Sequence, residues 1–180
     1  KNSYVEINLK IQKLYNLIDY LREGLQMKMT MAIDFTKSNG NPEKPGTLHE
    51  YNLENDNPYE KSMSTCGEII ALYATNNFFP CFGYGAVLPG KTEVSHCFNL
   101  DLNSDKDNPE IETMEKVLQV YNETIRKIKF KDPTYFSPII NKVIDMAKKN
   151  QSENKFIYNL IFLKIKLIIL FKLKLNFLCT

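Results

Sequence analysis

The chain has 180 residues, enough for one domain, and 43% apolar with 12% aromatic residues are sufficient to close a core. Residues 154–180 carry five lysines and no acid, which leaves 18 basic against 21 acidic groups in the first 153 residues. This acidic body offers no basic footprint for DNA or RNA, so we expect no nucleic-acid partner.

Four scattered cysteines form no Cys-x-x-Cys pair, a usage typical of a reducing, intracellular compartment. The sequence opens at Lys1 without a methionine, a basic n-region or an apolar h-region, which indicates a piece of a longer polypeptide with no visible targeting signal. We therefore expect a cytoplasmic protein and assign residues 1–13 to a linker from an upstream region.

Two elements are expected before residue 36. Apolar residues at steps of three and four predict an amphipathic helix over residues 11–22, with Gly24 as its stop. Residues 26–35 alternate Met or Ile with Lys, Thr or Ala, the period of two of a strand. Asp34 therefore lies at a strand's carboxyl end, the edge where ligands bind in open α/β sheets.

Asp34, Thr36 and Ser38 place one carboxylate and two hydroxyls at alternate positions after this strand. Mg²⁺ and Mn²⁺ favour oxygen ligands, and Mg²⁺ keeps several waters, so it needs few ligands from protein. The string is weak evidence alone, because Asp34 and Ser38 can equally shape a turn, which Asn39-Gly40 favours in any case. These three residues are a candidate metal site, and further evidence from the rest of the sequence is needed to support it.

After a long polar loop over residues 36–58, three further helices are predicted. Asn57-Pro58 and Asn108-Pro109 have the N-cap and first-turn signature of helix starts, and Ser137-Pro138 opens the third helix. Thr134 is expected on a short loop just ahead of that helix.

Strands are predicted at residues 78–86, at residues 94–102 and from about residue 156. The first contains Gly83 and Gly85, which suggest close approach of a neighbouring backbone. Strands that alternate with helices of this length imply a parallel sheet covered on both faces.

Other motifs carry no chemistry. The two strand glycines lack the third glycine and the following helix of a dinucleotide fingerprint. Residues 103–108 lack the glycine and glutamate of a calcium loop and are expected to form a solvated turn. His49 and His96, the two histidines, fall in no catalytic motif, so we expect no enzyme.

With these pieces in order, residues 14–163 resemble the von Willebrand factor A-type domain of the copine family. The resemblance rests on several separate motifs: Leu17-Ile18-Asp19-Tyr20, Gly24, Gln26, Ala32-Ile33-Asp34-Phe35-Thr36, Ser38-Asn39-Gly40, Leu48-His49, Asn57-Pro58-Tyr59, Gly67-Glu68-Ile69, Phe79-Pro80, Phe82-Gly83-Tyr84-Gly85-Ala86, Val94-Ser95-His96, Pro133-Thr134 and Pro138. It implies a Rossmann-like α/β fold, with a mostly parallel sheet and helices on both faces.

The A-type domain is similar to the integrin inserted domain, whose metal-ion-dependent adhesion site uses an Asp-x-Ser/Thr-x-Ser loop, a threonine on a second loop and an aspartate on a third. Carried over residue by residue, this implies Asp34, Thr36, Ser38 and Thr134 around one Mg²⁺ or Mn²⁺ ion. An open coordination position would accept a partner's carboxylate.

The third loop departs from the family pattern. Where the family has a Thr-Asp-Gly loop, Leu163 runs into Lys164-Ile165-Lys166, and no acid follows Glu153. We therefore expect weak metal binding and an incomplete C-terminal part of the fold.

Copines are intracellular proteins that join two calcium-dependent, phospholipid-binding C2 domains to the A-type domain. Nothing in residues 1–180 looks like a C2 domain, so calcium and membrane binding are expected only through domains outside this chain. The resemblance implies a non-catalytic module that binds intracellular proteins. The related A-type domain of RING-type ubiquitin ligases, which would present substrates, shares residues 34–39 and 57–60 and is the alternative.

Residues 164–180 form an atypical tail. Residues 154–178 use only amino acids that codons of A and T alone can encode, as in translated noncoding sequence. Lysines interrupt every 18-residue apolar window, which argues against a membrane helix. We expect a lysine-interrupted apolar strand that is prone to self-association.

Overall fold

The computed structural model describes residues 14–23, 26–52, 54–72, 74, 77–103, 109–149, 157–163 and 166–168. Its helices are α1 (Leu17–Arg22), α2 (Pro58–Ala71), α3 (Met114–Ile125) and α4 (Ser137–Lys149), with a 3₁₀ turn, η1 (Lys37–Asn39). Its strands are β1 (Gln26–Asp34), β2 (Phe78–Tyr84), β3 (Ala86–Val87), β4 (Val94–Ser95), β5 (Phe98–Asn99), β6 (Glu110–Glu112), β7 (Lys129–Phe130), β8 (Ile157–Leu163) and β9 (Lys166–Ile168).

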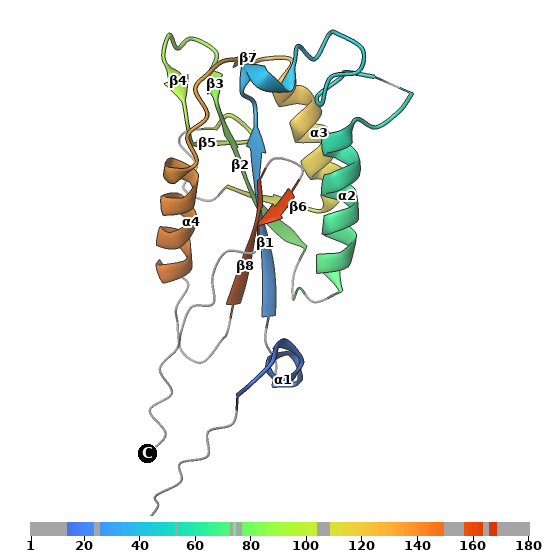
Figure 1. Ribbon diagram of the computed structural model, residues 1–180, viewed down its shortest axis with the longest axis vertical. Helices are drawn as coiled ribbons and strands as arrows, with labels where there is room; N and C mark the ends of the chain where they lie inside the picture. Colours follow the sequence, from blue (N-terminus) through green and yellow to red (C-terminus); the bar gives the residue numbers. More distant parts are fainter. Residues whose placement is uncertain are drawn as a thin grey trace, which may run out of the picture.

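The main sheet has the order β5-β2-β1-β8-β9, with β6 also paired to β2. Its centre is parallel, since β1 pairs in parallel with β2 and with β8, while β5, β6 and β9 pair in antiparallel fashion. The register sets Asp34 beside Tyr84. A smaller antiparallel sheet, β4-β3-β7, lies beyond the carboxyl ends of β1 and β2 (Figure 1).

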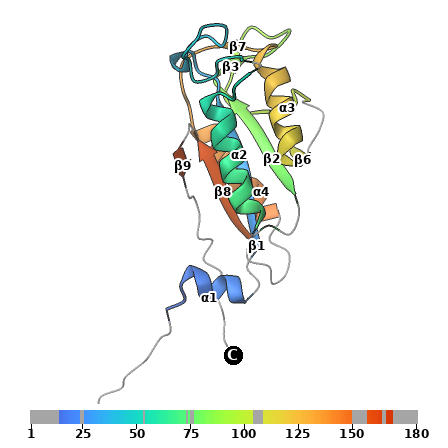
Figure 2. The same ribbon diagram turned by 90° about the vertical axis from the view of Figure 1, so that its right-hand side faces the viewer.

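Helices cover both faces of the main sheet, which confirms the predicted α/β class. Helix α4 lies on one side and α2 with α3 on the other (Figure 1), and Figure 2 shows the latter pair in front of the strands. Side chains alternate between two cores: Met31 and Ile33 join the larger core that includes residues of α2 and α3, and Ala32 joins the smaller one with Ile139 and Val143 of α4. Both faces of β1 are therefore buried.

The predicted helix start at Asn57-Pro58 is confirmed in detail. The Asn57 carboxamide oxygen accepts hydrogen bonds from the backbone N–H groups of Tyr59 (2.9 Å) and Glu60 (3.0 Å). The Glu60 carboxylate accepts in return from the Asn57 N–H at 2.8 Å. This reciprocal capping box satisfies donors that the first turn of α2 would otherwise leave unpaired.

The predicted helix start at Asn108-Pro109 is wrong. Residues 110–112 form β6, and α3 begins only at Met114, with Thr113 as its N-cap. The buried Ile111 lies opposite Phe79 of β2, so pairing with a distant strand overrides the local signal of the Asn-Pro pair.

The single strands predicted over residues 78–86 and 94–102 are each divided. The first breaks at Gly85, whose φ of +76° favours glycine and whose added Cβ would lie 2.3 Å from Thr36 Cγ2. The second becomes β4 in the small sheet and β5 in the main sheet. The close approach expected at Gly85 is therefore present, and the neighbour is Thr36, within residues 34–38, which we call the metal loop.

Several predictions fall outside the described residues. They are the linker at 1–13, residues 11–13 of the first predicted helix, residues 104–108 of the predicted turn, and residues 164–165 and 169–180 of the tail. The first helix was predicted to start too early, since the described residues 14–16 are not helical and α1 begins at Leu17. Of the tail, residues 166–168 form β9 against β8. Among the described helices, none has both the length and the apolar character needed to cross a membrane.

Candidate metal site at the sheet edge

Three of the four predicted ligands lie together where β1 ends. Thr36 donates to one carboxylate oxygen of the buried Asp34 twice, from its backbone N–H at 2.9 Å and from its hydroxyl at 2.6 Å. The Ser38 hydroxyl lies 3.2 Å from the Thr36 hydroxyl. Because Thr36 uses its proton on Asp34, Ser38 is the donor of this second contact, and its own lone pairs remain available as acceptors.

Two neighbours hold the metal loop in this shape. The buried Asn39 side-chain amide donates to the backbone carbonyl of Asp34 at 2.9 Å and to that of Thr36 at 3.3 Å. Gly85 lies against the Thr36 side chain from the β2 side, at a distance where no Cβ would fit. The main chain of the loop and the Thr36 side chain are thus held by contacts from outside the proposed ligand set.

A buried histidine, which the sequence does not predict as part of the site, supports the site from behind. One His49 ring nitrogen, Nε2, lies 2.7 Å from the backbone carbonyl of Asp34, and Nδ1 lies 2.7 Å from the Tyr121 hydroxyl. A carbonyl can only accept, so Nε2 carries the proton and Nδ1 accepts from Tyr121. The Tyr121 oxygen in turn accepts from the Asn57 side-chain amide at 3.2 Å.

These bonds form a directional chain, from Asn57 to Tyr121 to His49 to Asp34, which we call the buried relay. It joins the cap of α2, the middle of α3 and the end of β1. The His49 ring also stacks on Tyr59 with centroids 3.9 Å apart. Burial lowers the pKa of His49 from 6.5 to about 4, against smaller opposing effects of Asp34, so the ring is neutral at pH 7.

Thr134 lies on the loop between β7 and α4, as predicted, and stands outside the hydrogen-bonded group of Asp34, Thr36 and Ser38. Its loop reaches the same sheet edge, since Phe136 meets the Tyr84 ring edge-on at 5.7 Å and Tyr84 is the register neighbour of Asp34. Burial, and then the negative charge of Asp34, raise the pKa of the Tyr84 hydroxyl, which stays protonated.

The donor set is chemically suited to a hard cation. It contains one carboxylate and hydroxyl oxygens, the ligand types that Mg²⁺ and Mn²⁺ accept while they retain waters. Across the described part of the chain, no three His, Cys, Asp or Glu residues gather as a metal-binding cluster. The residues therefore fit a site of the Mg²⁺ type with a single protein charge, and they do not fit a zinc site.

A parallel central strand that ends in an Asp-x-Thr-x-Ser loop, with helices on both faces, defines an α/β domain of the von Willebrand factor A type. A family model described as Copine matches residues 47–165. Copine-A of Dictyostelium discoideum is 36% identical over 151 residues, which are 84% of this chain and 25% of that protein. The chain belongs to the copine family, and it spans about a quarter of the length of this curated relative.

The predicted copine resemblance is thus confirmed. The region matched by the family model contains His49 and Thr134 and begins after Ser38. A metal at Asp34, Thr36, Ser38 and Thr134 accordingly stays a prediction, and it enters the proposal below.

Proposed function

We propose that this chain is a non-catalytic protein-interaction module that holds one Mg²⁺ or Mn²⁺ ion with Asp34, Thr36, Ser38 and Thr134. The bound ion supplies a positive charge that a carboxylate of an intracellular partner protein can approach. The observation that carries the proposal is the group of three oxygens at the end of β1, joined by contacts of 2.6 and 3.2 Å.

The chain's own residues prepare this function by orientation. The Thr36 hydroxyl keeps its proton on Asp34, and Ser38 points its proton at Thr36, so the outermost hydroxyl offers lone pairs outward. Asn39 and His49 both donate to the Asp34 carbonyl and hold the main chain in place. Orienting neutral oxygens in advance lowers the ordering cost of binding.

We expect the affinity to be weak. Asp34 is the one carboxylate of the proposed set, the lower end of the one or two that protein sites for Mg²⁺ usually use. Lys164-Ile165-Lys166 stands where the family pattern supplies a further aspartate. A partner's acidic side chain would supply a second negative charge, so metal and partner should strengthen each other's binding.

In the whole protein we propose a copine-like role in calcium-dependent phospholipid binding, membrane trafficking and signalling, through C2 domains outside this chain. Calcium would act there, and the cytoplasmic protein would reach membranes peripherally. The copine match favours this assignment over the substrate-presenting domain of a RING-type ubiquitin ligase.

Isothermal titration of Mn²⁺ and Mg²⁺ into the 180-residue chain tests the metal proposal. Asp34→Asn keeps an oxygen for Thr36 but removes the charge, and should abolish the weak heat of binding. Asp145→Asn, at an exposed position on α4, is the matched control and should bind as the unmodified chain does. Unchanged titration of Asp34→Asn would show that this site is not the metal site.

A further inference from the structure

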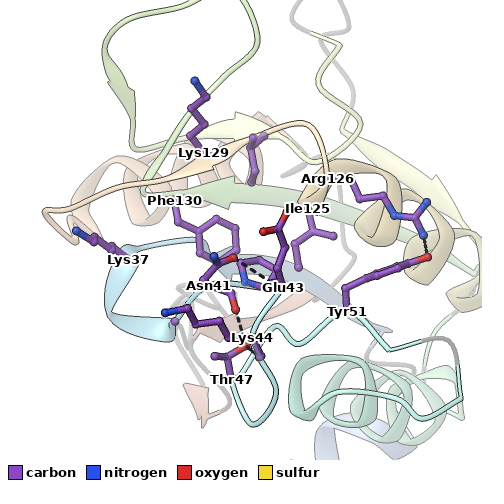
Figure 3. A pocket seen from close by; sticks show the side chains of 13 residues that line it. Lys37, Asn41, Glu43, Lys44, Thr47, Tyr51, Ile125, Arg126, Lys129 and Phe130 are labelled. Carbon is purple, nitrogen blue, oxygen red and sulfur yellow. Dashed lines mark hydrogen bonds between the residues drawn. The ribbon is translucent and has the colours of Figure 1, made fainter.

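A groove of about 870 Å³ lies beside the metal loop, between residues 37–51 and the segment where α3 leads into β7 (Figure 3). Lys37 is part of its lining, so the groove extends to the residue between two of the proposed ligands, Thr36 and Ser38. We call it the basic groove, after the side chains around it: Lys37, Lys44, Arg126 and Lys129.

The floor of the basic groove is apolar. Ile125 and Ile128 line it and are themselves only 5% and 7% exposed, and the half-buried Phe130 lies near the centre of the view in Figure 3. An apolar side chain laid on this floor would remove further apolar surface from water.

The rim is cationic and exposed. Its four cations come from four separate places in the chain: η1, the loop that follows η1, the residue after α3, and β7. They project away from the floor in Figure 3. Glu43 is the one acid among the described residues that line the groove. The lining therefore carries a net charge of +3, whereas the first 153 residues have more acids than bases.

Hydrogen bonds hold the walls in shape without a ligand. The Thr47 hydroxyl is within 3.0 Å of the backbone carbonyls of Asn41 and Lys44, and the Tyr51 N–H donates to the Pro42 carbonyl at 2.8 Å. The opposite wall is tied to this loop, because the Arg126 guanidinium lies 4.0 Å from the centre of the Tyr51 ring and donates to the Tyr51 hydroxyl.

We propose that the basic groove binds an acidic segment of a protein partner, with an apolar side chain on the floor and carboxylates beside the rim. A phosphate site would need several donors that converge on one point, whereas these cations stand apart around an apolar surface. The inference rests on the proposed interaction function, since a partner in this groove would extend from the metal loop.

Fluorescence anisotropy with a labelled peptide of alternating glutamate pairs and leucines tests this inference on the 180-residue chain. The double variant Lys44→Glu/Lys129→Glu should weaken binding by about tenfold or more, from two reversed charges near the ligand. Lys91→Glu/Lys142→Glu, an equal charge change at exposed positions elsewhere, should stay within about twofold of the unmodified chain. Glu43→Gln should tighten binding.

Further arms separate this inference from the metal proposal. Binding that persists in EDTA and in Asp34→Asn, but is lost in the groove variant, supports the groove even if the metal site fails. Equal binding of a glutamine-for-glutamate peptide, or equal weakening by the groove and control variants, would overturn the groove. So would displacement of the peptide by inorganic phosphate but not by chloride at equal ionic strength, which would indicate a phosphate site.

Discussion

Acid should destabilise this domain through His49 in particular. Its pKa is about 4 in the folded chain and 6.5 when unfolded, because burial disfavours the imidazolium. Between these two values the unfolded chain binds a proton at this ring and the folded chain does not, so the free energy of unfolding falls as the pH is lowered. Above pH 6.5 neither state is protonated there, and the stabilising effect is complete.

The magnitude follows from the difference between the two pKa values. One pKa unit corresponds to about 1.4 kcal/mol, so the full loss from pH 6.5 to below pH 4 is about 3–4 kcal/mol. Domains of this size have a total stability of about 5–15 kcal/mol, so this single ring accounts for a substantial share.

Urea denaturation at several pH values between 7.5 and 4 measures this effect. Carboxylates also titrate in the lower part of the range, so the informative quantity is the difference between the unmodified chain and His49→Gln, which cannot titrate. The variant should be less stable at pH 7, because the buried relay is broken, but its stability should decline less steeply toward pH 4. His96→Gln, at the other histidine, is the control. Parallel profiles for the unmodified chain and His49→Gln would refute the reasoning.

Two substitutions test the local supports of the fold and site by denaturation and by Mn²⁺ titration. Gly85→Ala should lose at least about 1 kcal/mol of stability and weaken metal binding, since its new Cβ meets Thr36. Gly90→Ala is the control, because Gly90 has a similar φ of +72° with open space around it. Equal losses of stability in the two variants would contradict the role of the clash. Asn57→Ala should lower the free energy of unfolding by about 1–2 kcal/mol, because it removes the cap of α2 and the bond to Tyr121. Asn52→Ala, at an exposed position, is the control and should lower it by less than about 0.5 kcal/mol. Similar losses of stability in the two variants would argue against the cap.

Signals confined to a few neighbouring residues were sufficient to predict part of this structure. The capping pair Asn57-Pro58 acts within one turn. The Thr36 hydroxyl bonds to Asp34 and the Ser38 hydroxyl contacts Thr36, all within five residues at the end of a strand. The start of α3 was predicted wrongly because Ile111 pairs with β2, a partner more than 30 residues away.

The surroundings of the site depend on contacts between distant segments. His49 has a defined role only once the fold brings Asp34 and Tyr121 to its two ring nitrogens. The spacing of apolar residues along the chain does not predict these contacts. The family motif that includes Leu48-His49 was the one signal that singled out this histidine, and it does not indicate which hydrogen bonds the ring makes. The basic groove likewise combines cations that are far apart in the chain.

The position of β1 between β2 and β8 has a consequence for how the chain folds. Gln26 pairs with Ile157, about 130 residues later, so one edge of the central strand has no partner until β8 is made. At typical rates of synthesis this delay is roughly 6 to 26 s. During that time the strand that ends in the metal loop presents an open, apolar hydrogen-bonding edge, which is free to pair with the wrong strand until β8 is made.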